Sequence, residues 1–427
     1  MNVRITPGAL SGRIGDVIAS KSQAHRVLIC AALADGPTRI ECNSQSQDIR
    51  ATARCIEALG AHVEFHTGGM DVNPIPRALE STDLPTLDCG ESGSTLRFML
   101  PLVGALGRKC AFTGQGLLAS RPLSPLYEQL AQHGMVMTPV GAFPLRCGGA
   151  LRPGRYEIAG NVSSQFITGL LIALPLLNGD SEIAIPGRLE SEPYVNMTLD
   201  ALAQFGIRIA RANGNDRVYH VAGGQRVTTP GRVRIEGDWS SAAFWLAAGA
   251  LGGVGVECAP LNVNSTQGDR AIVDILERFG AGVERCPGAV RVHPATLGGI
   301  ELDAADIPDL VPIVAVVAGA ARGVTRITSI SRLRLKESDR VASVLSMMRA
   351  LGVEAYEQGG ILIIRGRGTL LGGVVDAFND HRIAMAASIA GSAARTPVTV
   401  LGAQACAKSY PGFFEKFAAL GGRAEEV

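Results

Sequence analysis

The chain has 427 residues, of which 47% are hydrophobic and 19% charged, so it is long enough for two or three domains with a large core. Its formal net charge of +1 excludes a global electrostatic field for nucleic acid or a membrane surface, so any cationic site must be local. The longest apolar run, residues 242–256, is too short and too rich in glycine to span a bilayer, and the first residues lack a signal-peptide core, so we expect a cytoplasmic protein.

The first predicted element is a buried helix that begins at Lys21 and runs through an apolar stretch that has no glycine or proline before Gly36. Lys21 and Arg26 stand in its first turns, where each cation opposes the helix dipole by about 0.3 to 1 kcal/mol, and no acid within the helix offsets them. Ser22 and Arg26 are spaced i, i+4, so together with the free backbone N–H groups they predict an anion receptor. The alternative is a surface helix that happens to start with basic residues.

A repeat organises the rest of the chain. Six times a small polar cluster is followed by an apolar helix, a β-like segment and a second helix that closes at a glycine suited to the left-handed helix cap. These closing glycines are Gly60, Gly134, Gly206, Gly280, Gly352 and Gly421. They are separated by 74, 72, 74, 72 and 69 residues, a period too regular for chance. The first helices of the units are expected to begin near Lys21, Gly93, Ser163, Ser240, Asp309 and Asp380.

Stretches such as 232–236 and 361–364 predict strands between these units. Each unit is then predicted to contain a helix, a strand, a second helix and two more strands, in that order. Three such units can form a closed domain, with the first helices inside and the sheets outside. The sixth unit reaches the end of the chain without its last strands, so we expect residues 3–5 to supply one of them. The predicted domains are therefore 1–18 with 236–427 and 19–235, with crossings near 18–21 and 231–237. An ordinary doubly wound α/β fold is the alternative, which the six-fold period disfavours.

The openings of the first helices are the candidate site, because parallel inner helices would bring their N-termini to one face. In the second unit Gly93 allows close backbone approach to a ligand, although a glycine-serine turn is often only a cap. Arg121, before Pro122, lies later in the same unit. In the third unit Ser163 and the following Ser164 and Gln165 offer hydroxyl and amide donors for a phosphate, or else form an ordinary N-cap.

Charges gather again in the fifth unit. Lys336 and Arg340 are spaced i, i+4 at the expected start of its second helix, where they repel each other unless an anion lies between them. Glu337 and Asp339 could instead balance this charge on a solvated face. Asp309 is the only ionisable residue of an apolar helix start, and it is either an N-cap or a base held near low dielectric.

The sixth unit adds Arg382 in a first helical turn and Lys408 at the expected opening of its second helix. Seven cations thus stand at helix openings of one repeated architecture: Lys21, Arg26, Arg121, Lys336, Arg340, Arg382 and Lys408. Charge-assisted hydrogen bonds contribute about 1.5 to 3 kcal/mol each, so several of them can hold a small, multiply anionic metabolite. Nine cysteines without a Cys-x-x-Cys pair predict free buried thiols and no structural metal.

Six motifs taken together resemble the EPSP synthase (3-phosphoshikimate 1-carboxyvinyltransferase) family. They are Lys21-Ser22-x-x-x-Arg26, the Gly-Ser turn at residues 90–94, Ser163-Ser164-Gln165, the run 336–340, Asn379-Asp380-His381-Arg382 and the run 407–411, in the family's order over nearly the whole chain. The resemblance implies a two-domain inside-out α/β barrel of six βαβαββ repeats, three per domain, with a hinge that closes on substrate. It also implies transfer of the enolpyruvyl group of phosphoenolpyruvate to the 5-hydroxyl of 3-phosphoshikimate, with no metal or organic cofactor.

The family's site residues carry over by matching motifs. The implied contacts to 3-phosphoshikimate are Lys21, Ser22, Arg26, Ser163, Ser164, Gln165, Ser191, Tyr194, Asp309 and Lys336. Those to phosphoenolpyruvate are Lys21, Gly93, Arg121, Gln165, Arg340, Arg382 and Lys408. Tyr194 would pack under the shikimate ring, and apart from the resemblance it reads as a core tyrosine. For catalysis we assign Asp309 to the hydroxyl proton, Glu337 to the methylene proton and Lys21 to the charge of the adduct.

Three positions depart from the family pattern. Glu91 and Arg332 stand where asparagine is commoner, and Phe98 stands where proline is frequent. Glyphosate often inhibits members of the family, and these departures leave the sensitivity of this chain open. We expect a monomer, because no exposed apolar stripe stands out.

Two rival functions predict other sequence features. The sister enolpyruvyl transferase that acts on UDP-N-acetylglucosamine would have Lys-Asn where this chain has Lys21-Ser22. It would also carry a cysteine in the loop before Arg121, and residues 115–120 contain none. A ring-shaped clamp around nucleic acid, built from similar units, would spread basic residues over exposed helix faces. The neutral total charge and the cations at helix starts favour the transferase.

Overall fold

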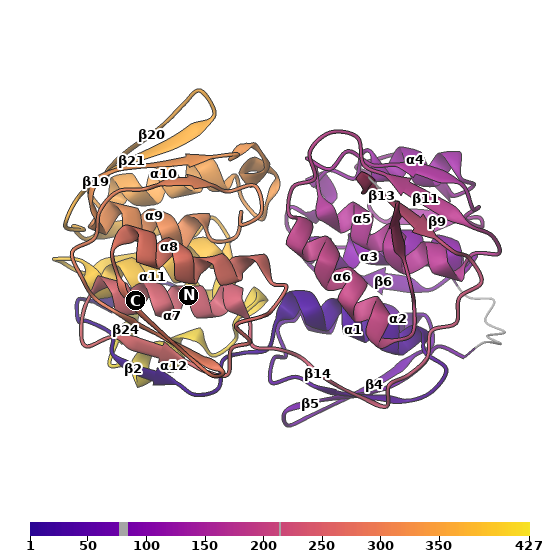
Figure 1. Ribbon diagram of the computed structural model, residues 1–427, viewed down its shortest axis with the longest axis horizontal. Helices are drawn as coiled ribbons and strands as arrows, with labels where there is room; N and C mark the ends of the chain where they lie inside the picture. The colour runs from indigo at the N-terminus through magenta and orange to yellow at the C-terminus, as the bar shows by residue number, and fades with distance from the viewer. Residues whose placement is uncertain (77–83, 213–214) are drawn as a thin grey trace. The chain divides into compact units, whose positions relative to one another are not determined.

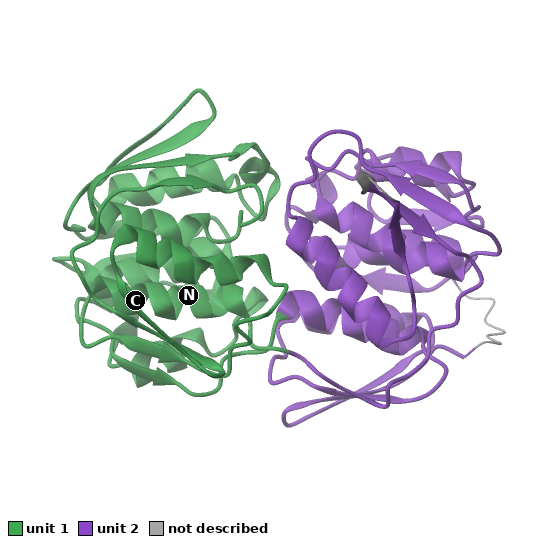
Figure 2. Ribbon diagram, in the orientation of Figure 1, with its two compact units in different colours: residues 1–20, 236–427 green, residues 21–235 purple. Residues whose placement is uncertain are grey.

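The computed structural model describes residues 1–76, 84–212 and 215–427 (Figure 1). Two compact units divide the chain: unit 1 is Met1–Ser20 with Glu236–Val427, and unit 2 is Lys21–Ile235 (Figure 2). The expected divisions lie after residues 18 and 235, and the units divide after Ser20 and Ile235. Unit 1 is therefore discontinuous in the sequence.

The described residues of unit 2 form three four-stranded sheets. Its strands are β3 (Thr38–Glu41), β4 (His62–His66), β5 (Gly69–Asn73), β6 (Thr86–Asp88), β7 (Cys110–Thr113), β8 (Val136–Met137), β9 (Leu145–Gly148), β10 (Arg155–Glu157), β11 (Ser181–Ala184), β12 (Ala210–Ala212), β13 (Asn215–Val221) and β14 (Arg232–Arg234). The strand orders are β14-β3-β5-β4, β6-β7-β9-β8 and β10-β11-β13-β12. In each sheet the first two strands are parallel and the remaining pairs antiparallel. A helix crosses over between β6 and β7 and between β10 and β11, whereas β14 and β3 come from the two ends of the unit.

Unit 1 repeats this plan. Its strands are β1 (Val3–Thr6), β2 (Gly12–Ile14), β15 (Val256–Cys258), β16 (Gly282–Cys286), β17 (Ala289–His293), β18 (Glu301–Asp303), β19 (Arg322–Thr328), β20 (Glu354–Gln358), β21 (Ile361–Arg367), β22 (Gly373–Asp376), β23 (Val398–Leu401) and β24 (Arg423–Glu426). The orders are β16-β17-β15-β2, β18-β19-β21-β20 and β22-β23-β1-β24. The N-terminal strands β1 and β2 therefore complete sheets whose other strands come from the C-terminal half.

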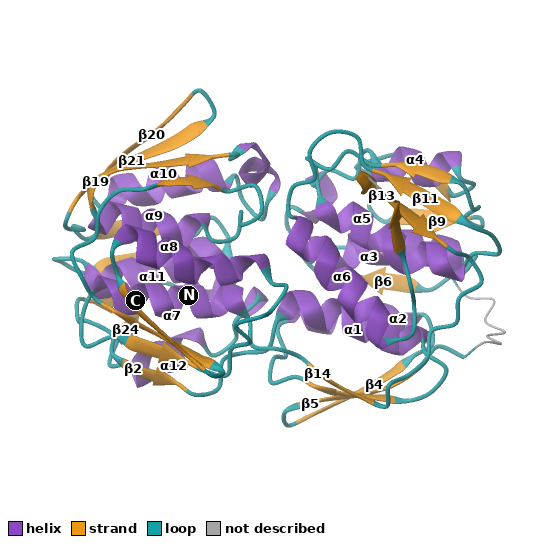
Figure 3. Cartoon of the chain, in the orientation of Figure 1, coloured by secondary structure: helices purple, strands orange, loops and turns teal. Residues whose placement is uncertain are grey.

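Among the described residues each unit carries six α-helices, and the most deeply buried of them lie inside the sheets (Figure 3). Those of unit 2 are α1 (Lys21–Leu33), α2 (Gln47–Ala58), α3 (Gly93–Ala105), α4 (Leu126–Gln132), α5 (Ser164–Ala173) and α6 (Glu192–Gln204). Those of unit 1 are α7 (Trp239–Leu251), α8 (Ile272–Phe279), α9 (Val311–Ala320), α10 (Arg340–Ala350), α11 (His381–Ala393) and α12 (Phe413–Ala419). In unit 1 α7, α9 and α11 pack against one another and are buried almost all round, which is why their sequences show no polar face.

The repeat predicted from the sequence is confirmed. Each of the six closing glycines has a positive φ, between 71° and 107°, as the left-handed helix cap requires. The alternative of an ordinary doubly wound α/β fold is wrong, because the described strands form six separate mixed sheets. Residues 3–5 do pair with β23 in the sixth sheet. The expectation that the C-terminal segment lacks both last strands is wrong in part, because β24 supplies one of them.

Candidate active site

The opening of α1 carries the first predicted site residues. Lys21 Nζ lies 2.8 Å from Asp48 Oδ2, in the first turn of α2. The carboxylate that offsets the unfavourable position of Lys21 therefore comes from the next helix of the same unit, although none stands within α1 itself. The spacing within one helix gives no sign of such a partner.

Arg26 is a buried brace between helices. Its guanidinium donates to Thr198 Oγ1 at 2.8 Å, to the Tyr194 carbonyl at 3.0 Å, to Thr168 Oγ1 at 3.2 Å and to the Ser22 carbonyl at 2.6 Å. Burial lowers the pKa of Arg26 to about 10, so it stays charged at neutral pH. Ser22 and Arg26 are thus connected as expected, but through the Ser22 backbone, and Arg26 ties α1 to α5 and α6.

The α3 opening meets the α5 opening through polar contacts. Gln165 donates from Nε2 to Ser94 Oγ at 2.8 Å, and its Oε1 accepts from Arg97 Nη1 at 2.7 Å. Gly93 begins α3 directly against the Arg121 guanidinium, since a Cβ on Gly93 would lie 2.7 Å from Arg121 Nη1. The structure therefore brings together three of the predicted residues, Gly93, Arg121 and Gln165, with Ser94 and Arg97 as partners that the predicted set lacks.

Ser163 and Ser191 precede the two helices α5 and α6. Ser163 Oγ accepts from the Gln165 backbone N–H at 3.3 Å, so the N-cap interpretation of this motif is correct. Ser164 is the buried first residue of α5. Ser191 has a left-handed backbone, with φ of 58°, a strained conformation for a residue other than glycine. Tyr194 is only partly buried in the first turn of α6, so its interpretation as a core tyrosine is wrong.

In unit 1 the candidate site centres on Arg340, the first residue of α10, whose side chain is 1% exposed. Its guanidinium contacts Asp309 Oδ1 at 2.6 Å, Glu337 Oε2 at 2.7 Å and Asp380 Oδ2 at 2.8 Å. Ser338 donates its hydroxyl to the same Asp380 oxygen at 3.0 Å. One buried cation thus holds three carboxylates in fixed positions.

Asp309 is in turn shared among three cations. Besides Arg340, its carboxylate contacts Arg382 Nη2 at 3.1 Å and Lys336 Nζ at 3.4 Å. Burial raises the pKa of the Asp309 carboxyl, but Arg382, Lys336 and Arg340 outweigh burial and hold that pKa well below its usual range. The N-cap alternative is wrong, because Leu310 precedes α9 without a side-chain cap. Asp309 is therefore an ionised acceptor.

The fifth-unit cations are arranged differently from the sequence-based expectation. Lys336 follows the short 3₁₀ helix η4 (Ser331–Leu335) in an extended conformation, so Lys336 and Arg340 do not share a helix face. The anion between them is Asp309 of the protein itself. Asp339 caps α10 by accepting from the Ala342 N–H at 3.0 Å, and it pairs with Arg334 at 2.8 Å.

Lys408 ends η5 (Ala403–Lys408) and does not open α12, contrary to expectation. Its Nζ donates to the carbonyl of Asn379 at 2.7 Å, in a segment where Phe378 and Asn379 both have positive φ. Asp380 caps α11 by accepting from the Arg382 N–H at 2.9 Å. This strained turn therefore joins Lys408 to the start of α11, and strain of this kind gathers at functional sites.

The pKa of Lys336 is lowered to about 8. Burial is the largest cause, and the neighbouring cations Arg340 and Arg332 act in the same direction, while Asp309 and Glu337 oppose them. Lys336 can therefore change its charge near physiological pH. Arg332, one of the departures from the family pattern, thus has an electrostatic influence on a predicted site residue.

The other two departures lie in unit 2. Phe98 is buried under Arg26, whose guanidinium carbon is 5.1 Å from the ring centroid. The Glu91 carboxyl lies against Gly116, at 2.8 Å from where a Cβ would stand on that glycine.

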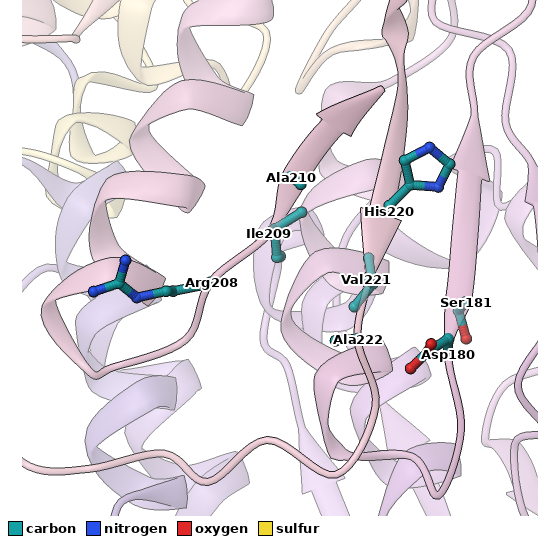
Figure 4. Close-up of a pocket in the computed structure, with 8 residues that line it drawn as sticks. All are labelled: Asp180, Ser181, Arg208, Ile209, Ala210, His220, Val221 and Ala222. Carbon is teal, nitrogen blue, oxygen red and sulfur yellow. The ribbon is translucent and has the colours of Figure 1, made fainter. Parts of the chain in front are cut away.

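A separate hollow in unit 2 lies beside β11, β12 and β13 and is lined by Asp180, Arg208 and His220, among others (Figure 4). It contains none of the predicted site residues.

In the described parts of the chain, no three His, Cys, Asp or Glu side chains are grouped so that they could hold a metal ion. No helix in the same described parts is long and apolar enough to cross a bilayer.

Four residues of these groups were missing from the predicted set: Asp48, Ser94, Arg97 and Asp380. Ser94, Arg97 and Asp380 stand inside motifs already noted in the sequence, and the position of Asp380 directly before a helix start was the available signal for a cap. Asp48 had no such signal, because it reaches Lys21 across 27 residues of sequence.

Comparisons with known proteins agree on one family. The family model described as EPSP synthase (3-phosphoshikimate 1-carboxyvinyltransferase) matches residues 5–417. A 3-phosphoshikimate 1-carboxyvinyltransferase of Clostridium kluyveri is 40% identical over 425 residues, covering 99% of this chain and 98% of the relative. One from Clostridium acetobutylicum is 40% identical over 428 residues, with 99% and 98% coverage.

Solved structures show the same relationship. The EPSP synthase of Acinetobacter baumannii superimposes with a TM-score of 0.81 at 25% identity, and each chain is covered completely. The enolpyruvyl transferase NikO from Streptomyces tendae has a TM-score of 0.78 at 18% identity, covering 99% of this chain and 98% of its own, which shows a shared fold.

Proposed function

The chain belongs to the EPSP synthase family, and we propose that it uses residues of both its units to transfer the enolpyruvyl group of phosphoenolpyruvate to 3-phosphoshikimate. It is an enzyme of the shikimate pathway, which leads to the aromatic amino acids. The acceptor is the 5-hydroxyl of 3-phosphoshikimate, and the products are 5-enolpyruvylshikimate 3-phosphate and phosphate.

The chemistry requires three proton transfers, two as the adduct forms and one as it breaks down. The 5-hydroxyl oxygen bonds to C2 of phosphoenolpyruvate while its proton leaves, and the C3 methylene gains a proton to become a methyl group. The tetrahedral adduct then loses phosphate from C2 and a proton from the methyl group, which restores the double bond. A proton acceptor, a proton donor and several cations are therefore needed around one carbon atom.

The group around Arg340 supports this proposal more than any other observation. Asp309 is an ionised acceptor and is assigned to the hydroxyl proton, and Glu337 is assigned to the methylene proton. Both carboxylates contact the same guanidinium, so their positions are fixed relative to each other. Arg340, Arg382 and Lys408 are assigned to phosphoenolpyruvate, and Lys336 to 3-phosphoshikimate.

Residues of unit 2 complete the assignment. Gly93, Arg121 and Gln165 are proposed to bind phosphoenolpyruvate, with Gln165 also contacting 3-phosphoshikimate. Lys21 is proposed to contact both substrates and to stabilise the adduct. The remaining contacts to 3-phosphoshikimate are proposed to be Ser22, Arg26, Ser163, Ser164, Ser191 and Tyr194.

Phosphate release with different acceptors tests the proposed function. We expect purified protein to release phosphate from phosphoenolpyruvate with 3-phosphoshikimate present, and to release none with UDP-N-acetylglucosamine or without an acceptor. Release with UDP-N-acetylglucosamine alone would instead identify the sister activity.

We propose further that the protein is a cytoplasmic monomer and that units 1 and 2 are the family's two enolpyruvyl transferase domains. Glyphosate is a possible inhibitor, which would compete with phosphoenolpyruvate. Light scattering of the purified protein tests the monomer. Inhibition kinetics with varied phosphoenolpyruvate test the competition.

Gly93→Ala is expected to raise the KM for phosphoenolpyruvate about tenfold or more, the usual effect of one misplaced methyl group in a binding site. The new Cβ would lie 2.7 to 3.2 Å from three atoms of the Arg121 guanidinium and would displace it. We expect the KM for 3-phosphoshikimate to change much less. Gly15→Ala is the matched control, because nothing lies within 4 Å of a Cβ at that exposed position.

The pKa of Lys336 predicts a pH dependence. Lys336 is cationic below its pKa of about 8 and neutral above it, so kcat/KM for the anionic 3-phosphoshikimate should fall as pH rises through that value. Lys336→Arg keeps a cation over this range and should remove the fall even if it lowers the rate. A profile that stays flat in the wild type to about pH 9.5, well above that pKa, would show that Lys336 does not bind substrate as a cation.

A further inference from the structure

A continuous chain of buried hydrogen bonds runs through unit 2 beside the proposed site. His25 Nδ1 lies 2.6 Å from Thr52 Oγ1, which lies 2.7 Å from Thr95 Oγ1. The Thr95 hydroxyl in turn donates to Ser92 Oγ at 2.8 Å. All four side chains are at most 2% exposed. None of the four is assigned a contact to either substrate.

The direction of each hydrogen bond in this chain follows from the number of protons. A hydroxyl group has one proton to donate. Thr95 gives its proton to Ser92, so its oxygen must accept from Thr52. Thr52 has then used its own proton, so its oxygen must accept from His25. His25 must therefore carry its proton on Nδ1.

The surroundings of His25 agree with a neutral ring. Nε2 is buried and makes no hydrogen bond in the described parts of the chain, and the ring stands edge-on to Phe98 with centroids 6.3 Å apart. Burial lowers the pKa of His25 to about 3, and Lys21 and Arg26 act in the same direction, while Asp48 opposes them. A second proton on Nε2 would have no acceptor, so the ring stays neutral with Nδ1 protonated.

The chain connects three helices whose N-terminal parts carry proposed site residues. His25 lies on α1, one turn after Lys21, and Thr52 lies on α2, which carries the Lys21 partner Asp48. Ser92 is the N-cap of α3, whose first residue is Gly93, and it accepts from the Thr95 backbone N–H at 3.2 Å. Helix α2 packs against both α1 and α3, so Thr52 stands at the middle of this arrangement.

We infer that His25, Thr52, Thr95 and Ser92 are positioning residues that fix the start of α3, and with it the phosphoenolpyruvate contact at Gly93, relative to Lys21 on α1. This inference rests on the proposed function, because Lys21 and Gly93 are the residues to be positioned. The neutral, Nδ1-protonated form of His25 is the form that this role requires.

Kinetics of three variants test the positioning role. Thr52→Val keeps the shape of the side chain but breaks both of its links, and His25→Leu removes the donor. Each should raise the KM for phosphoenolpyruvate about tenfold, the effect of one lost buried hydrogen bond, with kcat within about twofold. His25→Asn still offers an N–H donor and should restore most of the loss. The exposed His62→Leu is the control and should change neither KM.

Nitrogen-15 NMR of the histidine rings tests the proton position independently of turnover. We expect His25 to show a protonated Nδ1 and a bare Nε2, unchanged between about pH 5.5 and 8. In Thr52→Val this fixed tautomer should be lost. A protonated Nε2 in the wild type, or a ring that titrates over this range, would contradict the hydrogen-bond direction derived above.

The outcomes separate the inference from the proposed function. A wild-type protein without transferase activity refutes the proposed function, and the positioning role falls with it even if the NMR result stands. An active wild type whose Thr52→Val and His25→Leu variants lose only thermal stability, with unchanged KM for phosphoenolpyruvate, refutes the positioning role alone.

Discussion

Asp309→Asn is expected to lower kcat by about 10²- to 10⁴-fold, the usual contribution of a positioned acid or base. The amide cannot accept the hydroxyl proton, and it leaves Lys336, Arg340 and Arg382 without the carboxylate that they share. Rapid-mixing turnover measurements at saturating substrates give the effect on kcat. Calorimetry with 3-phosphoshikimate shows separately whether the substrate still binds.

The matched control is Asp306→Asn, three residues earlier on an exposed position, which should leave kcat unchanged. Glu337→Gln should also slow turnover strongly, because it removes the proposed methylene acid. If Asp309→Asn and Glu337→Gln both bound the substrates normally and kept nearly full turnover, the assignment of the two proton transfers would be wrong.

Arg340→Met is expected to lower the free energy of unfolding by about 3 to 5 kcal/mol, the cost of removing one partner from a buried ion pair. Methionine fills similar space but leaves Asp309, Glu337 and Asp380 without their common cation. Urea unfolding followed by tryptophan fluorescence reports on unit 1, which contains Arg340, because both tryptophans, Trp239 and Trp245, belong to that unit.

Arg334→Met provides the control for Arg340. Arg334 also contacts two carboxylates in unit 1, Asp339 and Glu357, but its side chain is 42% exposed. Exposed pairs contribute about 0 to 1 kcal/mol, so its loss should be small. If the two variants lost equal free energy of unfolding, burial would not be what makes the ion pairs of Arg340 more stabilising than those of Arg334.

The repeat made most of the fold predictable. The regular spacing of the closing glycines and the small polar helix openings specify local structure, so the openings of α1, α3, α5 and α11 could be located to within a residue. The pairing of Val3–Thr6 with the sixth sheet could be inferred because that unit needed a strand. The helix openings depend on a few neighbouring residues, and the strand pairing could be predicted because the repeat lacked a strand in its last unit.

The pairing within the site was less predictable. The sequence predicted cations that are available to bind an anionic ligand. In the structure four of them contact carboxylates of the protein, namely Lys21, Lys336, Arg340 and Arg382. These partners reach across 27 to 73 residues, apart from Glu337, so no local spacing reveals them. The i, i+4 spacing of Lys336 and Arg340 also gave a wrong prediction. The two residues do not share a helix, because the 3₁₀ helix η4 ends before Lys336 and α10 begins at Arg340.

Such pairing changes how the site is understood. Carboxylates that hold cations in place reduce the reorganisation needed when an anionic substrate arrives, which favours electrostatic stabilisation of the transition state. Asp309, Glu337 and Asp380 thus hold the Arg340 guanidinium in position, and we propose that Asp309 and Glu337 also move protons.

Carbon-13 NMR of the complete reaction tests whether the enolpyruvyl group is transferred to 3-phosphoshikimate. The purified protein is mixed with 3-phosphoshikimate and phosphoenolpyruvate labelled at C2, and the fate of the labelled carbon is followed. We expect the label to move into an enol ether on the 5-oxygen of 3-phosphoshikimate, with one phosphate released for each ether formed. A label that stays in phosphoenolpyruvate, or that appears as free pyruvate, would contradict it.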